Sequence, residues 1–399
     1  MFYRFEVNHL YNIVCDKKYP KELDVKSLSL RINDLFDSNR KKVVYIKNEF
    51  DVTTFRYRAY NVIQSLENSN KYLATCFLVE ELKIIFKFID KIDLIVLQRC
   101  KWSFELESFI NYAKYHGKKI IYDMDDLIYD SKYVPDYLLN IGDYTDLSVA
   151  SLMGMSTSYK MAMQFCDAFI VSTPNLKLRI EKDFNKKTYV YHNFLNLEQE
   201  NVSKKILKTK NEMNSDHKFL IGYFSGSATH TRDLDIALDD ILKIMDKYDD
   251  VYFEIVGLMA IHSKFKKYVD NKRLIIRPFV NYQELQYLIG SVDLNIVPLQ
   301  NNEFNNCKSE LKYFEAGIVD VLTLASDNDV YGSVIDDGHD GFLTDEFNWY
   351  EKIEYIYKNR NKLDKVKNNA REKIINEYGC YNQTKKLEDM FGKIIREEI

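Results

Sequence analysis

The chain has 399 residues, which exceeds the usual size of one domain and predicts two or three domains. Hydrophobic residues make up 46% of it and charged residues 29%, a balance that is typical of globular proteins and excludes disordered and fibrous classes. Its 56 lysines and arginines against 60 acidic residues give a net charge of −4, so we expect no nucleic-acid partner.

Short runs of β-branched and aromatic residues alternate with longer amphipathic stretches along the chain. This alternation predicts βα units around parallel sheets, which is an α/β fold. In the first half we predict strands at 42–46, 94–97, 119–122, 168–171 and 189–191. In the second half we predict strands at 219–223, 251–256, 274–276, 294–297 and 321–324. Two α/β domains of comparable size are therefore expected.

A polar segment at 196–217 separates the two halves and is predicted to be the interdomain linker. We place the first domain at 1–200 and the second at 215–375. From residue 362 to the end of the chain, apolar residues recur at helical spacing, which predicts one or two amphipathic helices. Residues 1–40 carry no clear motif.

The six cysteines are widely spaced and form no Cys-x-x-Cys pair, so we expect reduced thiols in a cytoplasmic protein. Arg4 and Glu6 stand where a signal peptide would need an apolar run. No stretch approaches the roughly 18 apolar residues that a membrane-spanning helix requires. The sequence therefore predicts neither secretion nor a transmembrane segment.

The strongest chemical motif is the segment 305–317, which follows a predicted strand. A helix that begins near Ser309 would place Lys308, Lys312 and Glu315 on one stripe of its surface. Free amide groups of the first turn and the lysines suit phosphates, and the carboxylate suits ribose hydroxyls, as in a nucleoside diphosphate. The alternative is an ion-pair ladder on a solvated helix.

A second motif is the cluster of Asp123, Asp125 and Asp126 at the end of the strand predicted at 119–122. Close carboxylates repel, so at least one needs a raised pKa or a cationic partner, and either makes a useful acid, base or cation site. The alternative is a set of helix caps. Asp123-Met124-Asp125 also matches a metal-binding Asp-x-Asp, although so short a pattern arises often by chance.

Two further motifs also follow predicted strands. The small-residue loop at 222–233 allows backbone N–H groups to approach a diphosphate, with positive charge from His230 and Arg232. Arg56 and Arg58 are interleaved with aromatic residues and suit an anionic or sugar-like ligand. Alternatively, these arginines are surface groups above an aromatic core edge.

The order of these motifs resembles the family-4 retaining glycosyltransferases, whose GT-B architecture has two Rossmann-like domains that face each other across a cleft. The resemblance extends over roughly residues 41 to 395. Glu315-Ala316-Gly317 is similar to the second glutamate of the family's Glu-x7-Glu motif, which holds the ribose hydroxyls. Cys307 stands at the position of the first glutamate, so this half of the motif is missing.

The resemblance implies a donor site in the second domain. Where the family has a Gly-Arg loop followed by Lys-Gly, this chain has Ser225-Gly226 and then His230 and Arg232. The segment 277–280 is similar to the one packed near the nucleotide base. The donor residues implied are Ser225, Gly226, Ser227, His230, Arg232, Phe279, Val280, Cys307, Lys308, Ser309, Lys312 and Glu315.

In the first domain the family carries a His-Asp pair beside the reacting bond. Asp125 aligns with the histidine and Asp126 with the aspartate, so the resemblance implies that these two residues and Lys308 act in catalysis. The acceptor residues implied are Arg56, Arg58 and Asp123. A C-terminal helix that crosses back to the first domain, here within 376–399, is also typical of the family.

The resemblance implies transfer of a sugar from a nucleoside diphosphate sugar to an acceptor hydroxyl with retention of configuration. Lys308, Arg232 and nearby amides would stabilise the leaving diphosphate, so no metal ion and no cofactor is required. The expected acceptor is a carbohydrate or a lipid-linked or protein-linked glycan in surface polysaccharide assembly. A lipid-linked acceptor implies peripheral contact with the inner membrane face. The alternatives are an inactive binding protein of the same fold and a nucleotide-sugar epimerase.

Overall fold

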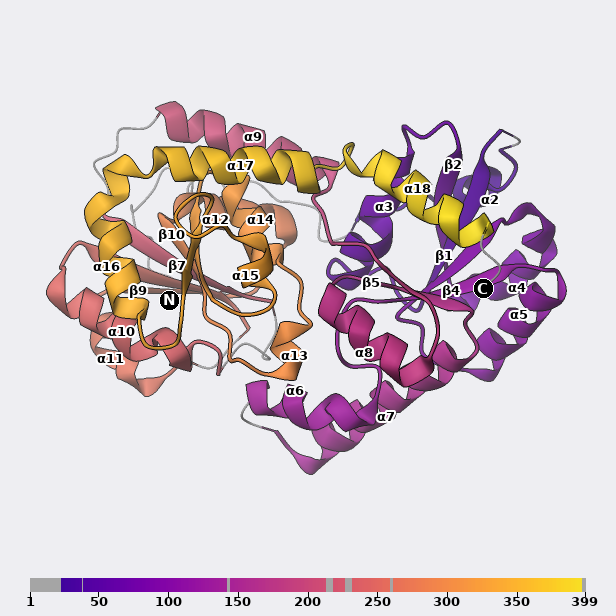
Figure 1. Ribbon diagram of the computed structural model, residues 1–399, viewed down its shortest axis with the longest axis horizontal. Coiled ribbons are helices and arrows are strands. Elements are labelled where there is room, and N and C mark those ends of the chain that lie inside the picture. Colours follow the sequence, from indigo (N-terminus) through magenta and orange to yellow (C-terminus); the bar gives the residue numbers. More distant parts are fainter. Residues whose placement is uncertain are drawn as a thin grey trace.

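The computed structural model describes residues 23–37, 39–141, 144–212, 218–226, 232–258 and 261–396. These residues form two lobes, each built on a six-stranded parallel sheet with helices on both sides (Figure 1). The predicted α/β class with two Rossmann-like parallel sheets is confirmed. The carboxyl ends of the strands, where such sheets bind ligands, are the places to look for a site.

The first lobe contains a sheet with the strand order β2-β1-β3-β4-β5-β6. Its strands are β1 (Lys41–Lys47), β2 (Tyr72–Leu78), β3 (Leu94–Gln98), β4 (Lys119–Met124), β5 (Ala168–Val171) and β6 (Thr188–Val190). Its helices are α2 (Leu28–Asp34), the π-helical turn η1 (Arg56–Tyr60), α3 (Asn61–Leu66), α4 (Leu82–Ile85), α5 (Phe104–Tyr115), α6 (Val134–Ile141), α7 (Asp146–Gln164) and α8 (Pro174–Phe184). The strands are largely buried, as expected where helices cover both faces of a parallel sheet.

The second lobe contains a sheet with the strand order β12-β11-β10-β7-β8-β9. Its strands are β7 (Phe219–Ser225), β8 (Val251–Gly257), β9 (Leu274–Arg277), β10 (Leu294–Val297), β11 (Leu322–Ser326) and β12 (Phe342–Thr344). The helices of the second half of the chain are α9 (Leu197–Glu212), α10 (Asp235–Lys247), α11 (Lys266–Asp270), α12 (Tyr282–Ser291), α13 (Glu303–Asn306), α14 (Leu311–Gly317), α15 (Tyr331–Val334), α16 (Trp349–Asn359), α17 (Asp364–Tyr378) and α18 (Gln383–Arg396).

All the strands predicted from the sequence are present, and the sheets also contain β2 and β12, which were not predicted. The β2 segment runs with little interruption into the apolar stretch 82–89, so the pattern gives no clear strand end. β12 has only three residues, too few for a period to emerge.

The segment predicted to be a polar linker, 196–217, instead contains α9, which packs against α12 of the second lobe. Val202 and Ile206 are apolar residues that it buries, and they lie one turn apart. Two apolar positions among many lysines gave too weak a period to predict this helix.

The chain returns to the first lobe at its C-terminal end (Figure 1). α17 packs against α14 of the second lobe, whereas α18 packs against α3 of the first. On α18, Glu388 accepts hydrogen bonds from Ser69 at 2.7 Å and from Lys71 at 3.0 Å. The limits that we predicted for the two domains remain a prediction.

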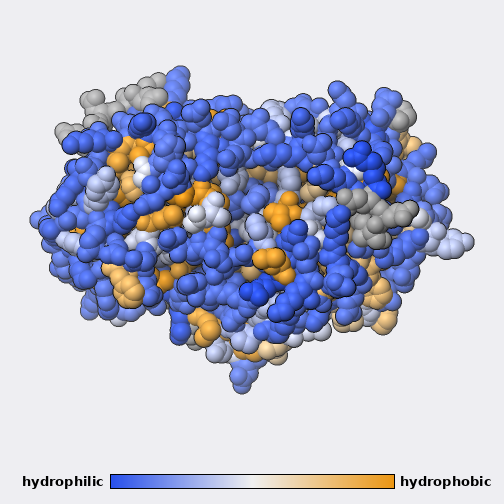
Figure 2. All heavy atoms as spheres, viewed as in Figure 1, coloured by the Kyte–Doolittle hydropathy of each residue, from blue (hydrophilic) through white to orange (hydrophobic). Residues whose placement is uncertain are grey.

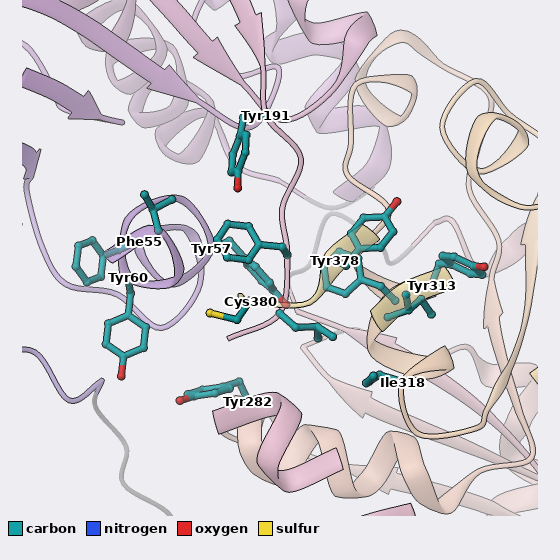
Figure 3. Close-up of a cluster of buried hydrophobic side chains, with 14 of the residues drawn as sticks. Phe55, Tyr57, Tyr60, Tyr191, Tyr282, Tyr313, Ile318, Tyr378 and Cys380 are labelled. Atoms are coloured by element: carbon teal, nitrogen blue, oxygen red, sulfur yellow. The ribbon is translucent and has the colours of Figure 1, made fainter. Parts of the chain in front are cut away.

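A buried cluster of aromatic residues joins the two lobes (Figure 3). Tyr57 comes from η1 of the first lobe, and Tyr313 and Tyr378 come from α14 and α17. The ring of Phe314 lies between those of Tyr57 and Tyr378, with centroid distances of 6.2 and 4.9 Å. Because these contacts cross between the lobes, apolar burial favours the closed arrangement of the protein.

The outer face in Figure 2 is mainly hydrophilic, with hydrophobic residues gathered in patches over one lobe and near the middle of the molecule. Among the residues that the structure describes, no helix is both long enough and apolar enough to cross a membrane.

Candidate functional site

A cavity of about 490 Å³ lies between the two lobes, and residues of both lobes line it. Its first-lobe wall includes residues that directly follow β3 and β4, and its second-lobe wall includes the ends of β7 and β8. The predicted residues that line it are Arg56, Asp125, Asp126, Ser225, Gly226, Phe279, Val280, Lys308, Ser309, Lys312 and Glu315. The structure therefore brings together residues that are up to 259 positions apart in the chain, from Arg56 to Glu315.

The segment before α14 supplies two lysines to the cavity. α14 begins at Leu311, two residues later than predicted, so Lys308 precedes the helix and Lys312 lies in its first turn. Glu310 stands at the start of the helix and accepts hydrogen bonds from His192 and Tyr378, both at 2.9 Å. His192 lies between β6 and α9, and Tyr378 is the last residue of α17, so both come from parts of the chain that connect the two lobes. Their hydrogen bonds hold the start of α14 where the lobes meet.

The ammonium group of Lys312 is buried in the wall of the cavity. Its Nζ atom is buried and has no hydrogen-bond partner among the described residues, although it lies 5.1 Å from the ring centre of Tyr223. Burial, together with the nearby charge of Lys308, lowers the pKa of Lys312 to about 8. Burial also lowers the pKa of Lys308, while Asp126 and Asp233 act in the opposite direction. An anion in the cavity would offset the cost of burying both ammonium groups.

Glu315 lies one turn beyond Lys312 on α14 and is 7% exposed. Its Oε1 atom accepts hydrogen bonds from the Tyr57 hydroxyl and, at 3.3 Å, from Gln199. Arg56 Nη2 lies 3.8 Å from the same oxygen. Side chains of η1 and of α9 thus hold the Glu315 carboxylate.

Arg56 lines the cavity from η1 and is 5% exposed. Its guanidinium lies between the rings of Tyr57 and Tyr282, at 4.0 and 4.5 Å from their centres, and Nε donates to Val52 at 2.9 Å. Its Nη1 atom is buried without a hydrogen-bond partner in the described part of the chain. A polar group of a bound ligand would satisfy this donor.

Arg99 organises the carboxylates on the opposite wall. Its Nε lies 2.6 Å from Asp125 Oδ1, and its Nη2 lies 3.4 Å from Asp126 Oδ2. Arg99 has a φ of 46°, in the left-handed region that few residues other than glycine adopt, so the backbone directly after β3 is strained to place this side chain. Burial raises the pKa of Asp126, and Arg99 and Lys308 oppose this rise.

Comparison with known protein families relates part of the chain to one of them. Residues 204–373 match the family model described as glycosyl transferases group 1. This segment runs from within α9 to within α17 and includes both cavity lysines. The second lobe is therefore similar to the glycosyl transferases of group 1.

Solved structures share the fold over both lobes. Anabaena Alr3699/HepE in complex with UDP-glucose is 12% identical, with a TM-score of 0.57, and the match covers 88% of this chain and 99% of that one. A glycosyltransferase from Rickettsia africae ESF-5 is 14% identical over 90% and 100% of the two chains, with a TM-score of 0.61. Sucrose-phosphate synthase from Thermosynechococcus elongatus is 11% identical over 89% and 99%, with a TM-score of 0.58. The architecture is therefore GT-B, whereas the sequence matches no curated protein.

Several residues that we predicted to bind the donor do not line the cavity. Cys307 is 1% exposed and packs with Phe304 in the core of the first lobe. Its backbone carbonyl accepts a hydrogen bond from the Thr173 hydroxyl at 3.0 Å. Arg232 is exposed and does not line the cavity. Its backbone carbonyl accepts a hydrogen bond from the Gln300 side chain at 3.1 Å. Ser227 and His230 lie outside the described residues.

Arg58 and Asp123 do not line the cavity either, contrary to the prediction that they bind the acceptor. Arg58 donates to both carboxylate oxygens of Asp123, at 2.8 and 2.9 Å, and both residues are almost fully buried. Arg58 Nη1 also donates to Tyr191 at 2.6 Å and to Asn193 at 3.0 Å. The two side chains thus bind each other inside the first lobe, which leaves neither of them available to a ligand.

The structure adds lining residues that the sequence did not single out. Arg99 follows an apolar strand, as the predicted residues do, so its position was a usable signal. The others were not named as candidate site residues, although some lie beside the predicted ones, and include Thr53, Thr54, Tyr57, Ile128, Tyr137, Met155, Tyr159, Asn193, Tyr282 and Tyr331. The cavity thus combines a few charged groups with a largely aromatic and apolar wall, which is typical of small-molecule sites.

Proposed function

We propose that this protein is a retaining glycosyltransferase that transfers a sugar from a nucleoside diphosphate sugar to an acceptor hydroxyl in surface polysaccharide or glycoconjugate assembly. The observation that carries the proposal is the buried ammonium group of Lys312, which finds no hydrogen-bond partner among the described residues and lies in an interlobe cavity that Lys308 also lines. The complex of HepE with UDP-glucose, a protein of the same fold, supports a donor of this class.

In this proposal the diphosphate lies against Lys308 and Lys312, near the backbone of Ser225 and Gly226. Negative charge gathers on the diphosphate as the glycosidic bond breaks, and fixed positive charges in a closed cavity stabilise that charge without reorganisation. The two lysines supply the positive charge, so we expect the reaction to need no metal ion and no cofactor. Glu315 is then placed one helical turn away, where it can accept from ribose hydroxyls.

The acceptor approaches from the wall that carries Asp125 and Asp126. Asp125 lies on the first lobe, opposite the lysines, so its carboxylate can accept the proton of the attacking hydroxyl or stabilise the positive charge that develops on the sugar. Closure of the lobes excludes water and so favours transfer over hydrolysis.

Replacement of Lys312 by glutamine should weaken the binding of a nucleoside diphosphate about 10- to 100-fold, because a charged hydrogen bond of about 1.5–3 kcal/mol is lost. In the unsubstituted protein, the pKa of about 8 for Lys312 adds a pH signature. Only the protonated amine pairs with the diphosphate, so affinity should fall as the pH rises above about 8. Calorimetry between pH 6.5 and 9.5 measures both effects.

Lys243→Gln provides the control for this experiment, since Lys243 is an exposed lysine of the same lobe on α10. It should leave both the affinity and its pH dependence unchanged. Equal affinity in Lys312→Gln and the unsubstituted protein would remove Lys312 from the donor site.

Replacement of Tyr57 by phenylalanine should tighten nucleoside diphosphate binding by up to about tenfold, the equivalent of about 1.4 kcal/mol. The Tyr57 hydroxyl occupies the Glu315 oxygen that a ribose would use, so its removal leaves that acceptor available. Tyr60→Phe is the matched control, because its hydroxyl donates to Glu198 at 2.8 Å and Tyr60 does not line the cavity. Weaker binding in Tyr57→Phe, measured by calorimetry, would show that the hydroxyl contacts the ligand instead.

A panel of nucleotide sugars tests the proposal itself. Binding of one member should raise the melting temperature, since a ligand at about 100 times its Kd adds about 2.7 kcal/mol of stability. That nucleotide sugar should then lose its sugar to an acceptor, and NMR of the product should show the anomeric configuration of the donor. Binding without turnover would indicate an inactive binding protein, and interconversion of nucleotide sugars without an acceptor would indicate an epimerase.

A further inference from the structure

The two walls of the cavity differ in charge. The second-lobe wall carries Lys308 and Lys312, which we assign to the diphosphate of the donor. The wall beyond β4 carries the carboxylates of Asp125 and Asp126 with a single guanidinium, that of Arg99. Arg56 and Glu315 also line the cavity, and Arg56 Nη2 lies 3.8 Å from Glu315 Oε1, so their charges offset each other. Once a diphosphate occupies the lysines, the carboxylate wall therefore keeps one net negative charge beside the anionic donor.

The side chains around this carboxylate wall are uncharged and mostly apolar. Ile128 follows β4, Tyr137 comes from α6, and Met155 and Tyr159 come from α7, where they lie one turn apart. The ring of Tyr137 packs edge-on against Phe304 of the second lobe, with 5.3 Å between centroids. We name these four residues the α6–α7 wall. Its aromatic and thioether groups offer flat apolar surface with few hydrogen-bonding groups.

We propose that the acceptor is an uncharged saccharide whose ring lies against the α6–α7 wall with its reacting hydroxyl at Asp125. This inference rests on the proposed function and specifies the substrate class of the same site. A pyranose has an apolar C–H face that packs on tyrosine rings, while its hydroxyls reach polar groups at the rim. A phosphate or carboxylate on the acceptor would be desolvated beside two carboxylates and the donor diphosphate, which is unfavourable.

The first test compares saccharides that differ only in charge. Methyl glucoside, methyl galactoside and methyl N-acetylglucosaminide are titrated by calorimetry, each beside its 6-phosphate, with the site saturated by the nucleoside diphosphate that the panel selects. At least one neutral saccharide should bind, and its 6-phosphate should bind at least tenfold more weakly. Equal or tighter binding of the phosphorylated compounds, or binding of none of the neutral ones, overturns the inference.

The second test uses two methionines of the same helix. Met155 lines the cavity, whereas Met153 lies on α7 but does not line it, and both are half-buried. Met155→Ala should raise the Kd of the neutral saccharide at least fivefold and leave the affinity for the nucleoside diphosphate unchanged. Met153→Ala should change neither value more than twofold. Identical saccharide affinities in the two variants would show that the α6–α7 wall is not the acceptor site.

Both tests measure binding and need no turnover, so they separate this inference from the proposed function. Saccharide binding with the expected charge and Met155 dependence, but without transfer from any nucleotide sugar, would support the inference and contradict the transferase. Efficient transfer to a phosphorylated acceptor would support the transferase and overturn the inference.

Discussion

Replacement of Arg58 by methionine should lower the free energy of unfolding by about 3–5 kcal/mol, because it leaves a buried carboxylate without its partner. Arg58 and Asp123 are 2% and 1% exposed and are joined by two hydrogen bonds. Burial raises the pKa of Asp123, and the Arg58 guanidinium limits this rise. Without Arg58 the folded protein would have to bury the charge or take up a proton, and either costs stability.

The loss in Arg58→Met should depend on pH in a defined direction. In the variant, the pKa of Asp123 in the folded state lies further above its unfolded value of about 3.9. A group with a raised folded pKa contributes its full stability below the unfolded pKa and loses it as the pH rises through the folded pKa. The variant should therefore be less destabilised at pH 4 than at pH 8, when each is compared with the parent at the same pH.

Urea unfolding can follow the first lobe alone, because the chain has two tryptophans, Trp102 in the first lobe and Trp349 in the second. In a Trp349→Phe background, the fluorescence of Trp102 reports the lobe that contains Arg58. The double variant Arg58→Met/Asp123→Leu should recover part of the loss, since no unpaired charge remains. Unchanged stability in Arg58→Met, with a raised KM for the acceptor, would restore Arg58 to the acceptor site.

Much of the fold could be predicted because the strands of buried parallel sheets are nearly continuous apolar runs. The run at 168–171 is β5 itself, and the run at 294–297 is β10. The helix that was not predicted, α9, lacks such a clear apolar pattern. The only apolar residues that α9 is seen to bury fully are Val202 and Ile206, beside Gln199 and Ser203, so tertiary packing on α12 determines its structure more than its own period does.

The candidate site was predictable only in part, because the sequence shows where a charged residue stands but not which way it faces. Lys312 and Glu315 lie one turn apart on α14, so their helical spacing places them together, and Lys308 lies just before the same helix. Arg58 and Asp123 also follow or end strands, yet they pair across 65 positions of the chain and leave the cavity. A pairing of this range depends on where the fold places η1 relative to β4, which no local pattern contains.

The structure shows which residue lines the cavity near the position of the missing first glutamate of the family motif. Cys307 is buried where the lobes meet, and the neighbouring Lys308 lines the cavity instead. Lys308 interacts electrostatically with Asp126 of the opposite wall, so a cation of one wall and a carboxylate of the other influence each other across the cavity. In the proposed function, a diphosphate bound at Lys308 would therefore also change the charge that Asp126 experiences.

Replacement of Asp125 by asparagine should reduce kcat about 10²- to 10⁴-fold, the range expected when a general base or a charge at the reacting bond is removed. Its affinity for the nucleoside diphosphate should change less than threefold, since Asp125 lies on the first-lobe wall. Arg99 stays paired with Asp126 at 3.4 Å, so the variant should remain folded. Initial rates at saturating donor, together with calorimetric titration of the nucleotide, separate the two effects.

Asp130→Asn is the matched control for this experiment. Asp130 belongs to the same loop after β4, but it pairs with Lys160 at 2.5 Å and does not line the cavity. Its replacement should leave kcat within twofold of the parent at a temperature well below unfolding. A common loss of kcat in both variants would indicate that the loop only needs its structure, whereas a loss confined to Asp125→Asn places the carboxylate at the reacting bond. Full activity of Asp125→Asn would exclude it from the chemistry.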